Sequence, residues 1–234
     1  MFCKGERNTM KIHADLTQRA VVDSTELDWV PSPMAGVERR MLERDGEEVA
    51  RATSLVRYAP GSSFSAHNHD LGEEFLVLDG IFSDETGDFP KGMYVRNPPG
   101  SRHVPSSEPG AVILVKLRQM HPGDDSFVRV NTLDPGGWQA GRAGEQILPL
   151  FIRPEEEVVM LDWQPGTALD AQTFPGGVEY FVVDGSFEDQ DGRYDQGTWL
   201  RLPPGSEQTI RTTRGTRVWR KSGHLCDRET QSHD

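Results

Sequence analysis

The feature that most constrains the fold is a repeat. Residues 56–103 recur at residues 161–208 after a shift of 105 positions, without a gap. In this alignment 17 of the 48 paired positions are identical, far more than unrelated segments share, which indicates a duplicated domain. The identities fall mostly on turn-forming glycines and prolines and on alternating apolar positions, the residue types that determine a fold. We therefore predict two copies of one fold in this chain.

Short apolar runs between turn signals make up the first copy. Strands are expected at 50–58, 75–78, 93–95 and 111–117, separated by Gly, Pro and Asp. No segment of this half keeps the 3.6-residue period of an amphipathic helix over ten or more residues. The pattern predicts an all-β protein of the sandwich or barrel type.

The division of the chain follows its composition. Residues 1–28 are polar and weakly patterned and are expected to form an N-terminal arm before a first domain at 29–120. Residues 121–141 are rich in Gly, Pro and Asp, which predicts a connector. The second domain is predicted at 142–225, with a polar tail at 226–234.

The chain is acidic, with 25 Lys and Arg against 37 Asp and Glu and a net charge of −12. Such a surface repels nucleic-acid phosphates and anionic membranes, so neither is expected as a direct partner. No signal-peptide pattern and no apolar run of membrane-spanning length are present, so a cytoplasmic protein is expected. Cys3 and Cys226 stand alone and are predicted to be reduced thiols.

Four residues of the first copy have the spacing of a metal site. His67 and His69 are two apart, so their side chains share one face of a strand. Glu73 begins the next apolar run, and His103 follows the turn at 98–100 that ends a third run. Imidazole nitrogens and one carboxylate suit a borderline divalent ion such as zinc, iron(II), manganese or nickel. The sequence therefore predicts one divalent ion held by His67, His69, Glu73 and His103.

The second copy lacks this set. The residues aligned with the four candidate ligands are Gln172, Phe174, Val178 and Gln208. Because the second copy keeps the turns and the apolar pattern but replaces all four, the histidines and the glutamate of the first copy have a role beyond packing. The second domain is predicted to be metal-free.

These spacings lead to a family. The pattern G-x5-H-x-H-x3-E-x6-G at 61–80 and the pattern G-x5-P-x-G-x2-H at 92–103 match the two-part signature of the cupin superfamily. Ser107 stands where the second part usually ends in Asn, a position that is not a ligand. The resemblance implies an all-β bicupin, two double-stranded β-helix or jelly-roll barrels in tandem.

A closer resemblance lies in the amino-acid sequence of residues 73–88 and 94–103, which is similar to the cupin domain of ChrR-type anti-sigma factors. In that family the two histidines, the first glutamate and the later histidine bind zinc, which favours zinc at the corresponding four residues here. ChrR-type proteins begin with a helical sigma-binding domain that carries an H-x3-C-x2-C motif, and residues 1–28 do not contain it. A tight sigma-factor complex is therefore not expected.

Two functions remain open. The favoured one is a metal-binding protein of the sensory class: a zinc cupin in an oxidative-stress or transcription-regulation context. The alternative, also implied by the resemblance, is an iron(II)-dependent cupin dioxygenase that cleaves a diketone or hydroxyketone. Whether the protein is an enzyme stays open, and no catalytic residue is assigned. The expected partners are a small-molecule ligand in the first domain and a second copy of the chain in a homodimer.

Other polar residues have structural interpretations. Glu74 points away from Glu73 on a strand and aligns with Glu179 of the metal-free copy, so it is predicted to be a structural or solvated glutamate rather than a ligand. Arg96 likewise has a counterpart in Arg201, which favours a structural ion pair. The remaining histidines are expected to be solvated in loops or tails: His13, His121, His224 and His233.

Overall fold

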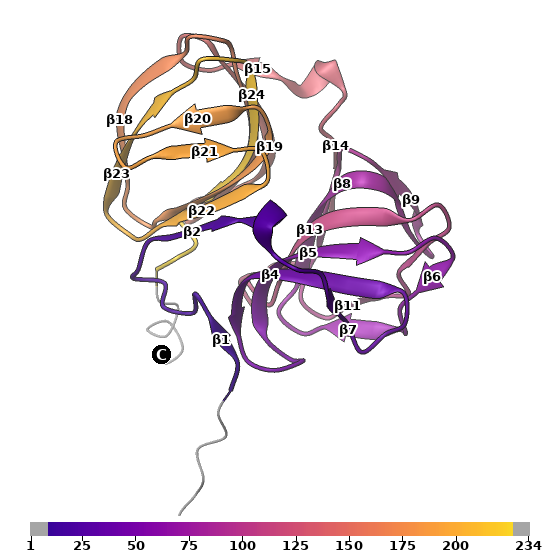
Figure 1. Ribbon diagram of the computed structural model, residues 1–234. Helices are drawn as coiled ribbons and strands as arrows, with labels where there is room; N and C mark the ends of the chain where they lie inside the picture. The colour runs from indigo at the N-terminus through magenta and orange to yellow at the C-terminus, as the bar shows by residue number, and fades with distance from the viewer. Residues whose placement is uncertain (1–8, 227–234) are drawn as a thin grey trace, which may run out of the picture. The chain divides into compact units, whose positions relative to one another are not determined.

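The computed structural model describes residues 9–226, and the chain forms two units (Figure 1). The first contains residues 9–14, 29–91 and 95–127, and the second contains residues 15–28, 92–94 and 128–226. Among residues 9–226 there is no α-helix, which confirms the predicted all-β class. The outer residues of the predicted arm and tail, and Cys3, lie outside the described part.

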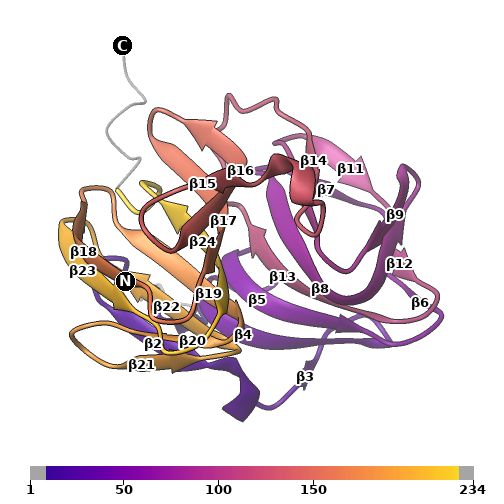
Figure 2. The same cartoon turned by 90° about the horizontal axis from the view of Figure 1, so that it is seen from above.

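The first barrel, as we call strands β3 to β13, is built on antiparallel pairs in the order β4-β5-β13-β8, and β10 follows β8. Figure 1 and Figure 2 show β13 between β5 and β8. The short strand β1 (Lys11–Ile12) pairs with β4 at the edge. The strands of the barrel are β3 (Val30–Pro31), β4 (Val37–Asp45), β5 (Arg51–Tyr58), β6 (Ser62–Ser63), β7 (His67–His69), β8 (Glu73–Asp84), β9 (Gly87–Pro90), β10 (Met93–Asn97), β11 (Ser101–His103), β12 (Ser106–Ser107) and β13 (Ala111–Leu117).

The central strand β13 shows why these residues form a barrel. Its sequence is rich in β-branched and aliphatic residues, which fit a pleated surface covered on its faces. Ile113 pairs with Val56 of β5 on one side and with Val77 of β8 on the other. Since side chains alternate along a strand, Ile113, Val115 and Leu117 share one face. That face lines the interior of the first barrel.

The second barrel, strands β15 to β24, repeats this design. Its main sheet has the order β16-β17-β24-β19-β22, which matches β4-β5-β13-β8-β10 strand for strand and confirms the duplication. The strands are β15 (Gln139–Ala140), β16 (Glu145–Arg153), β17 (Glu156–Trp163), β18 (Ala168–Phe174), β19 (Val178–Asp184), β20 (Ser186–Glu188), β21 (Arg193–Asp195), β22 (Thr198–Leu202), β23 (Ser206–Arg211) and β24 (Thr216–Ser222). Before them come β14 (Val128–Asn131) and the short 3-10 helix η2 (Pro135–Gly137).

Part of the predicted N-terminal arm is a strand of the second unit. β2 (Ala20–Asp23) pairs antiparallel with β22, from Ala20 opposite Arg201 to Asp23 opposite Thr198. Ala20 and Val22 are buried while the residues between and after them are exposed. A period-2 pattern over four residues is too brief to be distinguished from a polar segment by sequence alone. The 3-10 helix η1 (Ser24–Glu26) follows, with Asp23 as its N-cap.

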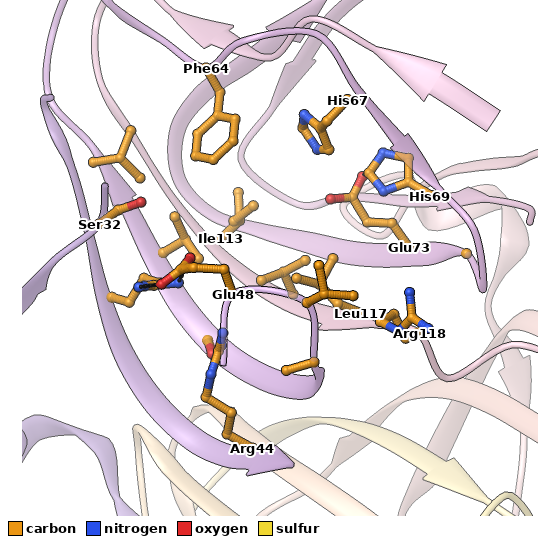
Figure 3. A pocket seen from close by; sticks show the side chains of 18 of the residues that line it. Ser32, Arg44, Glu48, Phe64, His67, His69, Glu73, Ile113, Leu117 and Arg118 are labelled. Atoms are coloured by element: carbon orange, nitrogen blue, oxygen red, sulfur yellow. Dashed lines mark hydrogen bonds and ion pairs between the residues drawn. The ribbon is translucent and has the colours of Figure 1, made fainter. Parts of the chain in front are cut away.

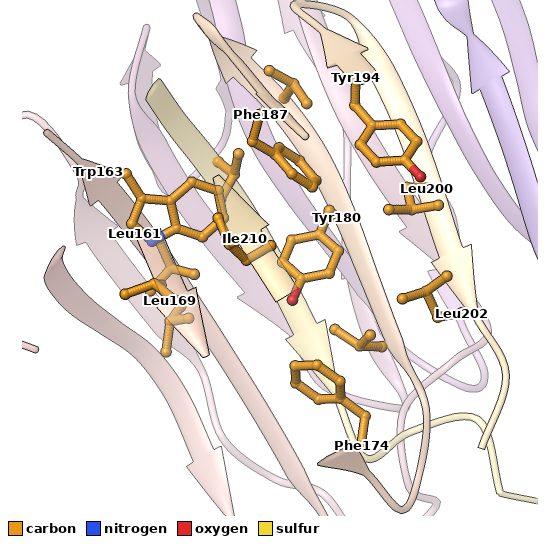
Figure 4. Close-up of a cluster of buried hydrophobic side chains, with 14 residues drawn as sticks. Leu161, Trp163, Leu169, Phe174, Tyr180, Phe187, Tyr194, Leu200, Leu202 and Ile210 are labelled. Atoms are coloured by element: carbon orange, nitrogen blue, oxygen red, sulfur yellow. The ribbon is translucent and has the colours of Figure 1, made fainter. Parts of the chain in front are cut away.

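Large apolar side chains fill the second barrel. They point toward one another from the strands around it (Figure 4). The buried cluster consists of Val159, Leu161, Trp163, Leu169, Phe174, Val178, Tyr180, Val182, Phe187, Tyr194, Leu200, Leu202, Ile210 and Val218. Burial of this much apolar surface stabilises the barrel without any help from a metal ion. Among residues 9–226, no helix is long and apolar enough to cross a membrane.

Candidate metal centre

The four predicted ligand residues come from three strands of the first barrel. His67 and His69 form the two ends of β7, and β11 pairs with β7 so that His103 lies opposite His67. The turn before β11 is fixed by a hydrogen bond from the Gly100 N–H to the His69 carbonyl, at 2.7 Å. Glu73 begins β8. The strand pairing and this turn therefore bring together residues that are 36 positions apart in the sequence, His67 and His103.

The side chains converge on one point. One potential ligand atom from each of His67, His69, Glu73 and His103 lies within 4.8 Å of the others. The Glu73 carboxylate oxygen Oε2 is 3.5 Å from Nε2 of His69 and 3.4 Å from Nε2 of His103. Both of these ring nitrogens are buried and have no hydrogen-bond partner. Buried polar atoms are normally satisfied, so two such nitrogens facing one carboxylate fit a cation between them.

Neighbouring polar groups orient the ligands. Nδ1 of His103 is 3.2 Å from the Asp84 carboxylate, and Nδ1 of His67 is 2.9 Å from the carbonyl oxygen of Ser65. A proton on each Nδ1 leaves the lone pair of Nε2 directed at the centre, which is the usual arrangement around a metal. The Asn97 side-chain N–H donates to Oε2 of Glu73 at 3.2 Å.

The protonation of the cluster follows from burial and charge. Burial lowers the pKa of His69, and Glu73 opposes this effect only in part. For His103, burial also disfavours the charged ring, but the hydrogen bond to Asp84 and the charge of Glu73 outweigh it and raise its pKa. A bound cation competes with protons for these nitrogens. Burial, followed by the charge of Glu73, raises the pKa of Tyr58 far above its usual value, so its hydroxyl stays protonated.

A cavity of about 590 Å³ adjoins the cluster, and His67, His69 and Glu73 form part of its wall (Figure 3). Apolar side chains make up much of the rest, from β4, β5 and β13 and from the segment before β7. They are Val37, Val56, Phe64, Ile113, Val115 and Leu117. This volume lies in the range of small-molecule sites.

The second barrel cannot form an equivalent cluster. Phe174 and Val178, which stand in the places of His69 and Glu73, belong to its apolar core. Gln172 pairs with Gln208 across β18 and β23, as His67 pairs with His103. The Gln208 side-chain N–H donates to Asp189 at 2.9 Å, which repeats the contact between His103 and Asp84 with an amide in place of the imidazole. Within residues 9–226, the group in the first barrel is the one that could hold a metal ion.

Glu74 and His224, which the sequence places outside the metal site, are both buried and paired in the structure. Glu74 is structural, the first of the two roles predicted for it: its carboxylate is 3.1 Å from Arg96, which is fully buried and also contacts Asp124 at 2.6 Å. The prediction that His224 is solvated is wrong, because its ring is buried 3.3 Å from Glu179. His233 lies outside the described residues.

Sequence reasoning missed the residues that orient the ligands. Asp84 recurs as Asp189 in the metal-free copy, so a comparison of the two copies gives it the pattern of a scaffold residue. Asn97 aligns with Leu202, and this polar-to-apolar difference was a signal that could have found it. Asp84 acts on the centre through its hydrogen bond with His103, and Asn97 acts through its hydrogen bond to Glu73.

We expect Asp84→Asn to weaken metal binding roughly 10- to 100-fold, because an uncharged amide orients and polarises His103 less well. Competition with a chelator of known affinity measures the change. Asp189→Asn is the matched control in the second barrel and should leave the affinity unaltered. Equal affinities for the two variants would contradict the role given to Asp84.

The comparisons with known proteins agree with this geometry. The model of the ChrR cupin-like domain matches residues 17–121 and again residues 127–225. None of the curated proteins matches the chain significantly.

Solved structures share the fold at low identity. A candidate dioxygenase from Nostoc punctiforme is 17% identical, with 90% of this chain and 85% of that chain covered and a TM-score of 0.73. The protein YlbA from E. coli is 13% identical, with 93% and 94% covered and a TM-score of 0.68. The pirin YhhW from Escherichia coli, solved in complex with nickel(II), is 12% identical, with 88% and 98% covered and a TM-score of 0.65.

These likenesses and the matching strand orders of the two barrels confirm the predicted tandem cupin fold. The family model accounts for both halves of the chain and for most of its length. The chain therefore belongs to the ChrR cupin-like domain family.

Proposed function

We propose that this protein is a metal-binding cupin that holds one divalent ion through His67, His69, Glu73 and His103. The observation that carries the proposal is the pair of buried, unsatisfied nitrogens, Nε2 of His69 and Nε2 of His103, which face the Glu73 carboxylate. A cation at this point would bind all three groups, whereas an empty centre leaves the two buried nitrogens without hydrogen-bond partners.

The donor set narrows the choice of metal. Three imidazoles, which are borderline ligands, outnumber one hard carboxylate, and this set suits zinc, iron(II), manganese or nickel better than calcium or magnesium. We propose zinc, and with it a sensory role in which a small molecule in the cavity, or an oxidant, acts on the centre. The ion also stabilises the folded barrel, since the cluster forms only when β7, β8 and β11 are in place.

A second candidate function is an iron(II)-dependent dioxygenase that acts on a diketone or hydroxyketone. The cavity favours it, because three of the four ligand residues line a space with largely apolar walls that is large enough for a small organic molecule. In this function the metal would supply a Lewis-acidic centre for the organic substrate and oxygen. The protein would position the substrate and exclude water.

Metal analysis of protein purified without added metal tests the proposal. We expect about one equivalent of a divalent ion per chain, and zinc in excess over iron. Protein reloaded with iron(II) is then supplied with acetylacetone while dissolved oxygen is recorded. Metal-free protein that takes up no added ion would overturn the proposal, and iron-dependent oxygen consumption would favour the dioxygenase over the sensor.

A further inference from the structure

The cavity has charged residues on a wall that the metal cluster does not occupy. Arg39 and Arg44, both on β4, line the cavity. In Figure 3 Arg44 lies well away from His69 and Glu73, with the apolar side chain of Leu117 between them. Cross-strand pairing connects the two sites: Glu73 of β8 pairs with Leu117 of β13, which pairs with Ala52 of β5. Ala52 in turn pairs with Arg44 of β4. Three steps between strands correspond to about 14 Å along the barrel wall.

A β-bulge places both arginines on this wall. Side chains alternate faces along a strand, so residues 39 and 44 of a regular strand would point to opposite sides. The register of β4 against β5 shifts between Met41 and Glu43, which inserts one extra residue. Arg39 and Arg44 therefore both face the interior of the barrel, where uncharged side chains are the rule.

The second barrel shows that the fold itself does not require these charges. Arg39 pairs with Val56, and Ile147 pairs with Leu161, which stands 105 positions after Val56. Ile147 therefore occupies the place of Arg39, and it packs against the apolar core of the second barrel. Arg44 pairs with Ala52, and Ile152 pairs with Glu157, which stands 105 positions after Ala52. Ile152 therefore occupies the place of Arg44.

The two guanidinium groups are not fully compensated. Arg39 contacts both carboxylate oxygens of Glu48 at 3.2 Å, but its Nε is buried without a hydrogen-bond partner. Glu48, with 62% of its side chain exposed, also lines the cavity, so the two arginines share one carboxylate on this wall. Arg44 donates to the carbonyl oxygens of Gly46 and Glu47 rather than to a carboxylate. Burial, and next the positive charge of Arg39, lower the pKa of Arg44.

We propose that the cavity binds an organic carboxylate, with the carboxylate at Arg39 and Arg44 and an apolar body along Val56, Ile113 and Leu117 toward the metal centre. A carboxylate matches the fork of a guanidinium group, and it adds a negative charge beside Arg44, whose hydrogen bonds go to carbonyl oxygens. The aliphatic wall between the two ends provides contacts for a chain or ring without polar groups. This inference rests on the proposed metal centre and adds the class of ligand.

Calorimetry on metal-loaded protein with two matched probes tests the inference. α-Ketosuberate has a metal-chelating keto acid at one end and a second carboxylate at the other, whereas α-ketooctanoate lacks the second carboxylate. We expect the wild-type protein to bind α-ketosuberate about tenfold more tightly, because a charge-assisted hydrogen bond in a buried site is worth at least this factor. Equal affinities for the two probes, or no binding of either, would overturn the inference.

Substitutions of the two arginines test whether they cause the preference for α-ketosuberate. Arg39→Ile introduces the residue of the second barrel, and Arg44→Met removes the other charge; each should reduce the preference for α-ketosuberate and leave metal content unchanged. Arg57→Met is the matched control, because Arg57 forms an ion pair with Glu38 between the same two strands but does not line the cavity.

The outcomes separate the two proposals. A preference that persists in both Arg39→Ile and Arg44→Met would overturn the inference while the metal centre stands. Protein that takes up no metal would overturn the proposed function. In that case an Arg39-dependent preference for α-ketosuberate, measured on the metal-free chain, would still support the carboxylate site.

Discussion

His69→Ala is expected to abolish stoichiometric metal binding. The His69 ring is 3% exposed, and its Nε2 has no partner other than the proposed ion. Structural zinc sites with four protein ligands bind with about 10–16 kcal/mol, so the loss of one ligand of four costs roughly 3–4 kcal/mol, or two to three orders of magnitude in affinity. Metal content after dialysis against a weak chelator, measured by elemental analysis, records the change.

The internal duplication supplies the control for this experiment. Gln208→Ala alters the residue that stands in the place of His103 in the second barrel, where no cluster forms among the described residues, so its metal content should equal that of the wild type. Circular dichroism of both variants checks that the barrels remain folded. Full occupancy in His69→Ala would remove His69 from the centre and with it the proposed ligand set.

Gly80→Ala is expected to cause a large loss of stability in the first barrel. Gly80 has a φ of +71°, and a Cβ at this position would lie 2.0 Å from the carbonyl oxygen of Gly110. A left-handed conformation alone costs an alanine about 1–2 kcal/mol. The clash is with backbone, which cannot turn away like a flexible side chain, so β8 and the chain at Gly110 must separate. We expect a loss of at least about 3 kcal/mol, close to the size of the largest effects of point mutations.

Gly61→Ala measures the cost of the left-handed conformation without the clash. Gly61 has nearly the same conformation, with a φ of +73°, but no atom lies within 4 Å of the place that a Cβ would take. It should lose only the conformational part, about 1–2 kcal/mol. Thermal and urea unfolding of the two metal-free variants, followed by circular dichroism, measure the difference. If Gly80→Ala is as stable as Gly61→Ala, the close approach to Gly110 is relieved at little cost.

The same close approach recurs in the second barrel. At Gly185, with a φ of +82°, a Cβ would lie 2.3 Å from the carbonyl oxygen of Gly215. This repetition explains why the glycine is shared by the two copies while the metal ligands are not. Gly80 and Gly185 serve the fold, whereas the four candidate ligands serve the chemistry of one barrel.

The duplication, the all-β class and the four residues of the cluster follow from patterns in the sequence. These are short-range properties: turn glycines mark where strands end, and a separation of two puts His67 and His69 on one face. The strand predicted at 111–117 coincides with β13, because a run of β-branched and aliphatic residues between turns has few alternatives. The replacement of all four candidate ligands in the second copy then distinguishes them from the residues that the fold itself requires.

The surroundings of the cluster depend instead on tertiary contacts. The part played by Asp84 could not be read from the sequence, because Asp189 repeats it in a barrel without a cluster among the described residues. The inward direction of both Arg39 and Arg44 depends on a bulge, and a bulge is set by how β4 pairs with β5 rather than by the residues of β4 alone. The cavity arises for the same reason: its volume is what the inward side chains of several strands leave unfilled, which no local pattern specifies.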